Sequence, residues 1–464
     1  MFYPSIARTS TRLFFGFAGM LGLLPMFASC GDGDKGPVAI HDASVPGTGG
    51  TSSTGGVQNT GGTSITGGST GTGGTSSTGG TQGTGGASST GGTSSAAGAP
   101  GTGGGPGTGG ASGLRDAGTP PDTDPASDGA ADTVGTATVR LQGRFDLADT
   151  TKPAFGWSGS AMIARFQGTG ATLRIDGSPN QFAVVVDGAV SSKVLKVVSG
   201  TTQYALATGL AAGVHDVVVW KRTEGNQGEN RFLGLDVAGG QLQVPPAAPD
   251  RRIEIYGDSI SAGYGMDGAG PNCAFTPDTE DHYLTYGAIS ARELNADLHA
   301  MAWSGIGMYR NYGVSGASSD AMPAVYARTL ASQSASVWDF STWQPHVVVI
   351  NLGTNDASSS GDPGTPYETA YLAFVRSLRQ KYPDTFFVLT IGPMLDGSNL
   401  TAIKGHLQNV IKTRSSEGDS KMSFLEFPVQ VAADGYGCDW HPSPSTNAKM
   451  ATLLTAELKA RLGW

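Results

Sequence analysis

Two different patterns of hydrophobic positions follow one another along this chain. From residue 134 to residue 244, short runs rich in β-branched and aromatic residues alternate with turn residues. Examples of these runs are residues 171–175, 182–187, 194–198 and 214–220. Short strands at regular spacing are typical of an antiparallel β-sandwich. The proline-rich segment at 244–249 then predicts a stiff linker to a second domain.

After residue 251 the pattern alternates between strand-like and helix-like segments. The strand-like runs are residues 252–257, 298–303, 346–352, 385–391 and 422–427, and the helical patterns are 282–295, 366–381, 399–413 and 445–462. The third run is almost continuously apolar, as expected for a strand buried on both faces. We therefore predict a three-layer α/β/α domain at 251–464, with a five-stranded parallel sheet in the flavodoxin-like order 2-1-3-4-5. Ligands of such sheets bind outside the carboxyl ends of the strands.

The segment before the sandwich has a very different composition. Glycine occupies 72 of the 464 positions, and most of the excess lies in Thr-Gly-Gly repeats between about residues 46 and 118. Such a segment has almost no apolar surface to bury, so residues 31–133 are expected to form a disordered linker. A flexible coil of about 100 residues has an r.m.s. reach of roughly 50–60 Å.

Residues 1–30 read as a targeting segment. Arg8 and Arg12 precede an apolar stretch at 13–27, and small residues then lead to Cys30. This arrangement resembles the lipobox of bacterial lipoproteins, in which the cysteine is diacylated; the alternative is a plain signal peptide. Both predict export, with the chain either lipid-anchored to the bacterial cell envelope or surface or, failing that, secreted.

The net charge and the number of cysteines limit the kinds of ligand, partner and metal site that the chain is expected to have. A net charge of −9 gives no electrostatic reason to bind nucleic acid or an anionic membrane, and it suits a neutral, sugar-like partner. We expect a monomer that meets the membrane only through its lipid anchor. After Cys30 only Cys273 and Cys438 remain, so the sequence offers no zinc-ligand spacing and we expect no metal. A disulfide between these two cysteines and a pair of free, buried thiols both stay open.

Polar or glycine-containing motifs follow the first three predicted strands of the second domain. Ser259, in Gly-Asp-Ser, is placed to expose a nucleophilic hydroxyl, although the same tripeptide also serves as an ordinary turn. Gly305 allows a backbone N–H to approach a ligand closely, and Asn355 offers a side-chain amide. Each also has a plain interpretation as turn chemistry. Together they predict a nucleophile with donors for a developing oxyanion.

A histidine follows the fifth predicted strand. His441 lies in Asp-Trp-His-Pro-Ser and is the candidate general base, with Asp439 as the group that would orient its imidazole. His282, at the start of a predicted helix, is a weaker rival for the base. His299 and His346 lie inside predicted strands and are interpreted as structural.

Four elements, in chain order, resemble those of the SGNH (GDSL-type) hydrolase superfamily over residues 251–464. They are Gly-Asp-Ser ending at Ser259, Gly305, the motif of Asn355, and His441 near the C-terminus. The resemblance implies Ser259 as nucleophile, His441 as base, and an oxyanion hole made by Gly305, Asn355 and the Ser259 amide. Many members carry an aspartate three residues before the histidine. Here Cys438 holds that position and the aspartate stands only two residues before His441.

A narrower resemblance rests on the segments at 257–265, 282–287, 303–311 and 439–443, which are similar to those of carbohydrate esterase family 2. That family joins a jelly-roll-like sandwich to an SGNH domain and removes O-acetyl groups from polysaccharides such as xylan and glucomannan, without a cofactor. Some members use a Ser-His dyad, so either Asp439 or a backbone carbonyl is left to orient His441.

Four aromatic residues near these motifs are candidates for stacking on sugar rings: Trp440, Trp303, Tyr264 and Tyr309. For Trp303, packing in the core is an equal alternative. Two other functions also fit the sequence. One is a lipase- or thioesterase-like hydrolase of other acyl esters, and the other is a surface carbohydrate-binding lipoprotein with a vestigial site.

Overall fold

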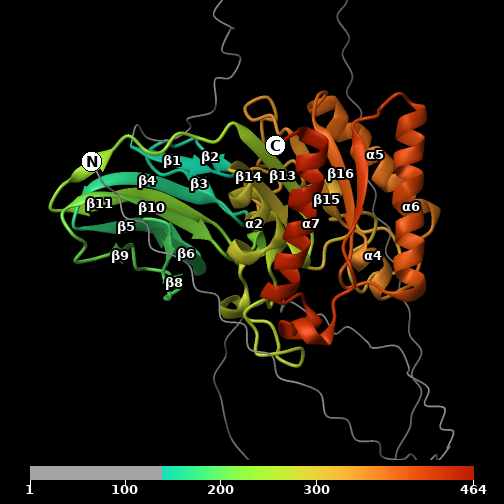
Figure 1. Ribbon diagram of the computed structural model, residues 1–464, viewed down its shortest axis with the longest axis horizontal. Helices are drawn as coiled ribbons and strands as arrows, with labels where there is room; N and C mark the ends of the chain where they lie inside the picture. Colours follow the sequence, from blue (N-terminus) through green and yellow to red (C-terminus); the bar gives the residue numbers. More distant parts are fainter. Residues whose placement is uncertain (1–137) are drawn as a thin grey trace, which may run out of the picture. The chain divides into compact units, whose positions relative to one another are not determined.

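The computed structural model describes residues 138–464, which form a β-sandwich followed by an α/β domain (Figure 1). The predicted targeting segment and linker, residues 1–133, lie outside the described residues. Among the helices of residues 138–464, none is long and apolar enough to cross a membrane.

The sandwich consists of two antiparallel sheets. One sheet has the order β1-β4-β10-β6-β7, with β12 beside β4 and β8 beside β6, and the other has the order β2-β3-β11-β5-β9. Their bounds are β1 Val139–Gln142, β2 Phe145–Asp146, β3 Ala154–Phe155, β4 Ala161–Gly168, β5 Gly170–Gly177, β6 Asn180–Val186, β7 Ala189–Val190, β8 Leu195–Val197, β9 Gln203–Ala207, β10 Gly213–Lys221, β11 Asn230–Ala238 and β12 Gln241–Gln243. Alternate side chains of both sheets, among them Phe166 and Phe232, point inward and form one buried core.

The second domain has the predicted parallel sheet, in the predicted order. It runs β14-β13-β15-β16-β17, which is 2-1-3-4-5 in chain order. The strands are β13 Arg251–Gly257, β14 Ala296–Ala302, β15 Val347–Asn351, β16 Phe386–Ile391 and β17 Met422–Glu426. The helices are α1 Ser259–Ala262, α2 Tyr286–Glu293, α3 Met322–Val325, α4 Thr354–Ser358, α5 Thr365–Lys381, α6 Gly397–Ser416 and α7 Pro444–Leu462.

Helices cover both faces of this sheet (Figure 1). Successive side chains of a strand point to opposite faces. Ile350 of β15 therefore packs into a core with α5 and α6, whereas Val349 packs into a core with α2 and α7. Burial on both faces explains why the middle strand reads as a continuous apolar run.

The sandwich packs against the edge strand β14 and contacts both faces of the sheet, because its Trp157 lies in the core with α5 and α6. Trp220 of β10 lies in the same buried core as residues of α2 and α7. Two buried ion pairs also join the domains, Arg140 with Asp297 at 2.8 Å and Arg144 with Glu254 at 2.9 Å. The two domains therefore share a continuous interior.

The register of the parallel sheet brings the predicted motifs to one edge. Gly257, the last residue of β13, lies opposite Ala302 of β14 and Asn351 of β15. The segments that carry Ser259, Gly305 and Asn355 therefore leave the sheet side by side.

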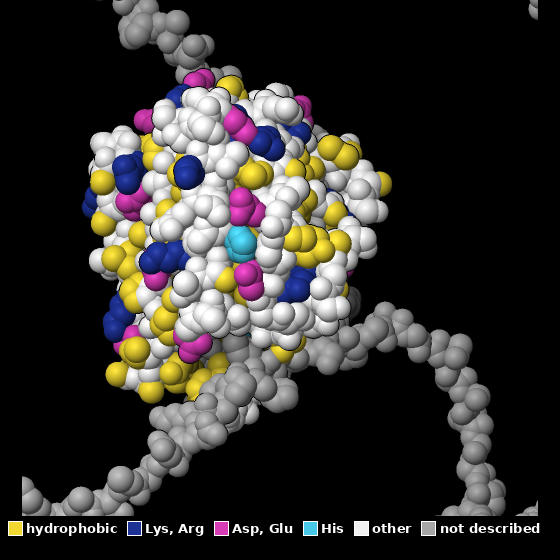
Figure 2. All heavy atoms as spheres, turned by 90° about the vertical axis from the view of Figure 1, so that its right-hand side faces the viewer, with side chains coloured by type: hydrophobic (Ala, Val, Ile, Leu, Met, Phe, Trp, Pro, Cys, Tyr) yellow, Lys and Arg dark blue, Asp and Glu magenta, His cyan; other side chains and the backbone are white. Residues whose placement is uncertain are grey.

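The outer face over α5 and α6 has basic and acidic side chains interspersed (Figure 2). Neither sign of charge gathers into a patch on this face (Figure 2).

Candidate active site

Ser259 is held at the tip of a tight strand-to-helix turn. It is the first residue of α1, and the side chain of Asp258 caps that helix by accepting from the Ile260 amide at 3.0 Å. Gly257 is required here because a Cβ at this position would lie 2.1 Å from Ser261 Oγ. The turn thus fixes the serine hydroxyl at the carboxyl edge of the sheet.

His441 lies next to this hydroxyl. Its Nε2 is 2.9 Å from Ser259 Oγ, and its Nδ1 lies 3.2 Å from the carbonyl oxygen of Cys438 and 3.1 Å from that of Asp439. Carbonyl oxygens only accept hydrogen bonds, so Nδ1 carries the proton and Nε2 accepts from the serine. This tautomer is the one a general base needs.

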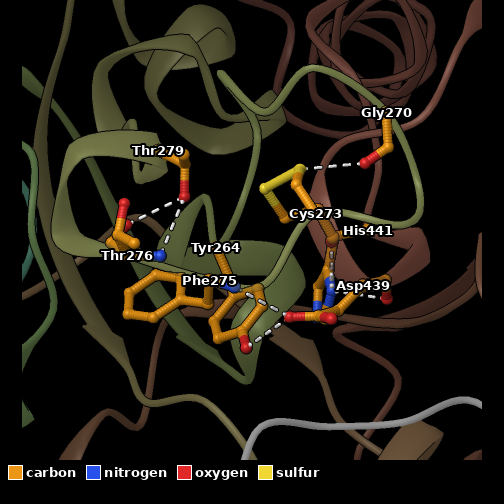
Figure 3. The surroundings of a disulfide bond; sticks show 9 residues. Tyr264, Gly270, Cys273, Phe275, Thr276, Thr279, Asp439 and His441 are labelled. Atoms are coloured by element: carbon orange, nitrogen blue, oxygen red, sulfur yellow. Dashed lines mark hydrogen bonds between the residues drawn. A yellow bond between two sulfur atoms is a disulfide. The ribbon is translucent and has the colours of Figure 1, made fainter.

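The carboxylate of Asp439 does not take the position predicted for it. It accepts from the Tyr264 hydroxyl at 3.0 Å and from the Phe275 amide at 3.1 Å (Figure 3). Asp439 and Trp440 both have left-handed backbone angles, with φ of 51° and 62°. This turn aims the main-chain carbonyls at the imidazole and the carboxylate at Tyr264. Of the two alternatives left by the sequence, the backbone carbonyl is the one that contacts His441.

Burial determines the acidity of the base. Only 2% of His441 is exposed, and burial lowers its pKa from 6.5 to about 4 because the charged imidazolium loses its hydration. The two carbonyl contacts and the charge of Asp439 act in the opposite direction and raise this pKa. The imidazole is therefore neutral, and able to accept a proton, from mildly acidic pH upward.

The loops that carry Gly305 and Asn355 are bonded to each other. The Asn355 amide donates to the carbonyl of Ile306 at 2.8 Å, so it links the two segments expected to bind an oxyanion. Gly305 has φ of 76°, a left-handed conformation that favours glycine.

The carboxylate of Asp356 holds the loop that follows Gly305. It accepts from the amides of Met308, Tyr309 and Arg310 at 2.8–2.9 Å. Three backbone bonds to one carboxylate leave this loop little freedom, which is the rigidity that an oxyanion site needs. Asp356 directly follows Asn355 in the Gly-Thr-Asn-Asp motif, where its carboxylate was expected to hold the loop by hydrogen bonds, and these bonds are present.

A disulfide joins Cys273 to Cys438, so the open question about these cysteines is resolved in favour of a bond. It ties the loop after the nucleophile to the turn before His441 (Figure 3). Backbone bonds reinforce it, from the Cys438 amide to Gly265 at 2.8 Å and from the Asp439 amide to Cys273 at 3.1 Å. The carbonyls that hold the imidazole therefore belong to a cross-linked turn.

The aromatic candidates divide into two groups. Tyr264 is buried, and its ring centroid lies 4.1 Å from that of Phe275 and 4.2 Å from that of His441, so it packs against His441 and has little ring surface exposed for a sugar (Figure 3). Trp303, Tyr309 and Trp440 remain half-buried beside the catalytic segments. Trp303 also packs edge-on against the sandwich residue Trp157, at 6.2 Å.

The rival base lies elsewhere. His282 is buried at the domain interface, where its Nδ1 accepts from the Trp220 indole at 3.2 Å. Burial lowers its pKa to about 3. It therefore serves packing between the domains.

A cavity of about 260 Å³ lies away from this chemistry. It is lined by Asp297 and His299 of β14, together with Trp338 and Trp343. Asp297 belongs to the amino-terminal part of β14, whereas Ser259 and Gly305 lie beyond the carboxyl ends of their strands. The chemistry of the residues, and not the size of the cavity, locates the candidate active site.

Known protein families match both domains of the chain. Residues 141–246 match the family described as carbohydrate esterase 2 N-terminal, and residues 255–455 match the GDSL-like lipase/acylhydrolase family. A solved family two carbohydrate esterase from Clostridium thermocellum, in complex with cellohexaose, is 43% identical with a TM-score of 0.68. The match covers 70% of this chain and 99% of that one. The chain belongs to carbohydrate esterase family 2.

Other members of the family extend the comparison. A family 2 enzyme from Myceliophthora fergusii is 34% identical with a TM-score of 0.62, over 70% of this chain and all of that one (100%). The cellulase/esterase CelE of Acetivibrio thermocellus is 43% identical over 70% of this chain, which spans 40% of the length of that relative. An acetylxylan esterase / glucomannan deacetylase of Cellvibrio japonicus is 26% identical over 70% of this chain and 89% of that protein. As a family 2 carbohydrate esterase, the chain is a carboxylic ester hydrolase.

Proposed function

We propose that this family 2 esterase is exported and removes O-acetyl groups from polysaccharides of the xylan and glucomannan type. The observation that carries the proposal is the 2.9 Å contact between Ser259 Oγ and His441 Nε2, beside the loops of Gly305 and Asn355. The relatives named acetylxylan esterase / glucomannan deacetylase support the substrate class.

The first half of the reaction acylates the enzyme. His441 Nε2 takes the proton of Ser259 as the serine oxygen attacks the acetyl carbonyl. The imidazolium so formed is stabilised at Nδ1 by the carbonyls of Cys438 and Asp439. When the tetrahedral intermediate collapses, the sugar oxygen leaves with the proton from His441, and the acetyl group stays on Ser259.

The second half releases acetate. Water loses a proton to His441 and attacks the acetyl-serine, and the serine oxygen then recovers that proton. In both halves the oxyanion lies against the amides of Ser259 and Gly305 and the side chain of Asn355, which are aimed at charge that exists only in the transition state and the intermediate. No cofactor takes part in either half.

Half-buried aromatic rings supply the contact with the sugar. Trp440, Trp303 and Tyr309 flank the catalytic segments and present flat apolar surfaces of the kind that pack on pyranose rings. We propose Trp440, which stands next to His441, as the first of these contacts.

We further propose that Cys30 is lipidated after removal of the targeting segment. The long Gly/Thr/Ser-rich linker then carries the catalytic unit away from the membrane. A Cys30→Ala variant expressed in a bacterium should leave the membrane fraction and fail to incorporate a labelled fatty acid. Unchanged labelling would contradict lipidation at this residue.

Acetate release from acetylated xylan, glucomannan and monosaccharide acetates tests the substrate class. We expect turnover of the acetylated sugars and poor activity on long-chain acyl esters. A preference for long chains or thioesters would instead favour the lipase-like alternative. Sugar binding without turnover of any acetylated substrate would favour a binding protein, a function to be tested here because one relative was solved with cellohexaose.

A further inference from the structure

A turn of the sandwich domain carries three buried charged side chains next to the active site. Lys221 ends β10, and Arg222 and Glu224 follow it; the three expose 0%, 4% and 1% of their surfaces. Burying a carboxylate in this way is costly unless its oxygens are bonded. We call residues 221–224 the sandwich turn.

Glu224 bonds to the loop expected to bind the oxyanion. Its Oε2 accepts from the backbone amide of Ser304 at 2.5 Å. Ser304 immediately precedes Gly305, whose N–H is a proposed oxyanion donor. A side chain of the other domain therefore touches the peptide next to the proposed donor.

Together with two other hydrogen bonds, this bond restrains the backbone before and after Gly305. The carbonyl of Gly305 accepts from the Tyr312 amide at 2.9 Å, and the next carbonyl, of Ile306, accepts from Asn355 at 2.8 Å. Glu224 supplies the restraint on the amino-terminal side. Because Gly305 has no side chain of its own, the direction of its N–H depends on restraints of this kind.

Glu224 is itself held at both ends of its backbone. Its amide donates to Glu280 Oε2 at 3.1 Å, and its carbonyl accepts from the Lys221 ammonium at 3.0 Å. The carboxylate that meets Ser304 is therefore mounted on a rigid turn and is not a mobile surface group.

The sandwich turn also contacts residues 280–281, which bond to the end of the helix that begins at Ser259. Arg222 pairs with Asp281 at 3.2 Å and donates to the Glu280 carbonyl at 3.1 Å. The Asp281 amide in turn donates at 3.0 Å to the carbonyl of Gly263, the residue that ends the nucleophile helix. The sandwich turn thus contacts the segments next to both backbone donors of the proposed oxyanion hole.

We propose that Glu224 is a positioning residue for acyl transfer, which holds the Ser304 amide so that the Gly305 N–H points to where the oxyanion forms. This inference rests on the proposed function of the site. It makes the sandwich domain a part of the catalytic unit. The competing explanation is that Glu224 only helps to join the two domains.

The test compares kcat and KM for p-nitrophenyl acetate in three variants. Glu224→Ala removes the acceptor, and we expect kcat to fall about 10- to 100-fold with KM little changed, since small misplacements of catalytic groups have effects of this size. Glu224→Gln keeps an acceptor oxygen and should recover most of that loss. Asp297→Asn breaks the buried interdomain pair with Arg140 at the other end of β14 and serves as the matched control.

Thermal unfolding of each variant separates positioning from stability. We expect Asp297→Asn to lower Tm while its kcat stays at the wild-type value. The inference is overturned if Glu224→Ala keeps wild-type kcat, if Glu224→Gln is as slow as Glu224→Ala, or if Asp297→Asn loses as much kcat as Glu224→Ala. A wild-type chain without turnover of any ester would instead overturn the proposed function, and this inference with it.

Discussion

The carboxylate of Asp439 accepts a hydrogen bond from the Tyr264 hydroxyl at 3.0 Å and does not hydrogen-bond to the imidazole of His441. The imidazole of His441, the proposed base, instead contacts the main-chain carbonyls of Cys438 and Asp439. These carbonyls belong to the main chain, so a substitution of the Asp439 side chain does not remove them. The orientation of the His441 ring should therefore depend little on the carboxylate of Asp439.

This relationship predicts a mild effect of Asp439→Asn. Loss of a carboxylate that orients a catalytic histidine lowers kcat roughly 10,000-fold in triad enzymes. Here we expect a fall of about tenfold or less, because only the through-space effect of the charge on His441 is lost. Steady-state kinetics on p-nitrophenyl acetate measures the difference, and a loss above about 1,000-fold would show that the carboxylate is essential.

The buried imidazole predicts activity at acidic pH. The base must be neutral to act, and burial lowers the pKa of His441 to about 4, so kcat/KM should decline only below about pH 4 and not near 6.5. Four buried neighbouring groups could add a second inflection. Burial raises the pKa values of Glu224 and Asp281 to about 6, raises the pKa of Glu280, and lowers the pKa of Lys221 to about 7. The profile should therefore also be measured in Glu224→Gln, Asp281→Asn, Glu280→Gln and Lys221→Met. An acidic limb at pH 6–7 that persists in all four variants would contradict the neutral, buried base.

Asn355 is expected to act in the transition state. Removing one oxyanion donor costs about 100- to 1,000-fold in kcat, and we expect this loss in Asn355→Ala with KM little changed. Asn355→Asp keeps the shape but has no N–H to donate, so it should be equally slow. If Asn355→Asp stayed close to wild type, neither the donation to an oxyanion nor the bond to Ile306 would be needed for turnover, and Asn355 would not be an oxyanion donor.

The disulfide predicts a coupling between redox state and activity. Cys273 and Cys438 are 165 residues apart in sequence, and chain-entropy models give about 5 kcal/mol of stabilisation for a loop of that size. Cys273→Ser should therefore lower Tm. It should also lower kcat well below Tm, because the freed turn carries the carbonyls that hold His441. A variant with lower Tm and unchanged kcat would limit the disulfide to stability.

The parallel sheet could be predicted because each of its strands and helices has a hydrophobic pattern that is visible in a short stretch of sequence. Five apolar runs separated by helical patterns indicate a parallel sheet, and the carboxyl ends of parallel strands meet at one edge. Ser259, Gly305 and Asn355 each follow one of these strands. Their proximity therefore followed from chain order and strand direction alone.

The orientation of side chains was not predictable in the same way. The direction of the Asp439 carboxylate depends on two consecutive left-handed residues, neither of which is glycine. The burial of Tyr264 depends on Phe275, which a disulfide-linked loop brings against it.

Glu224 was missed for a related reason. It belongs to the other domain, and its partner in the bond to Ser304 is a backbone amide, which carries no signal in the sequence. Contacts across domains are non-local, and no spacing or periodicity indicates them.

The central claim is that Ser259 carries the acetyl group during turnover. The most direct measurement is mass spectrometry of the enzyme quenched with acid during hydrolysis of p-nitrophenyl acetate, followed by peptide mapping. We predict that the mass of one acetyl group is added to the peptide containing Ser259, and that Ser259→Ala shows neither this adduct nor turnover. An acetyl group on another residue that tracks turnover, or full activity in Ser259→Ala, would contradict the account.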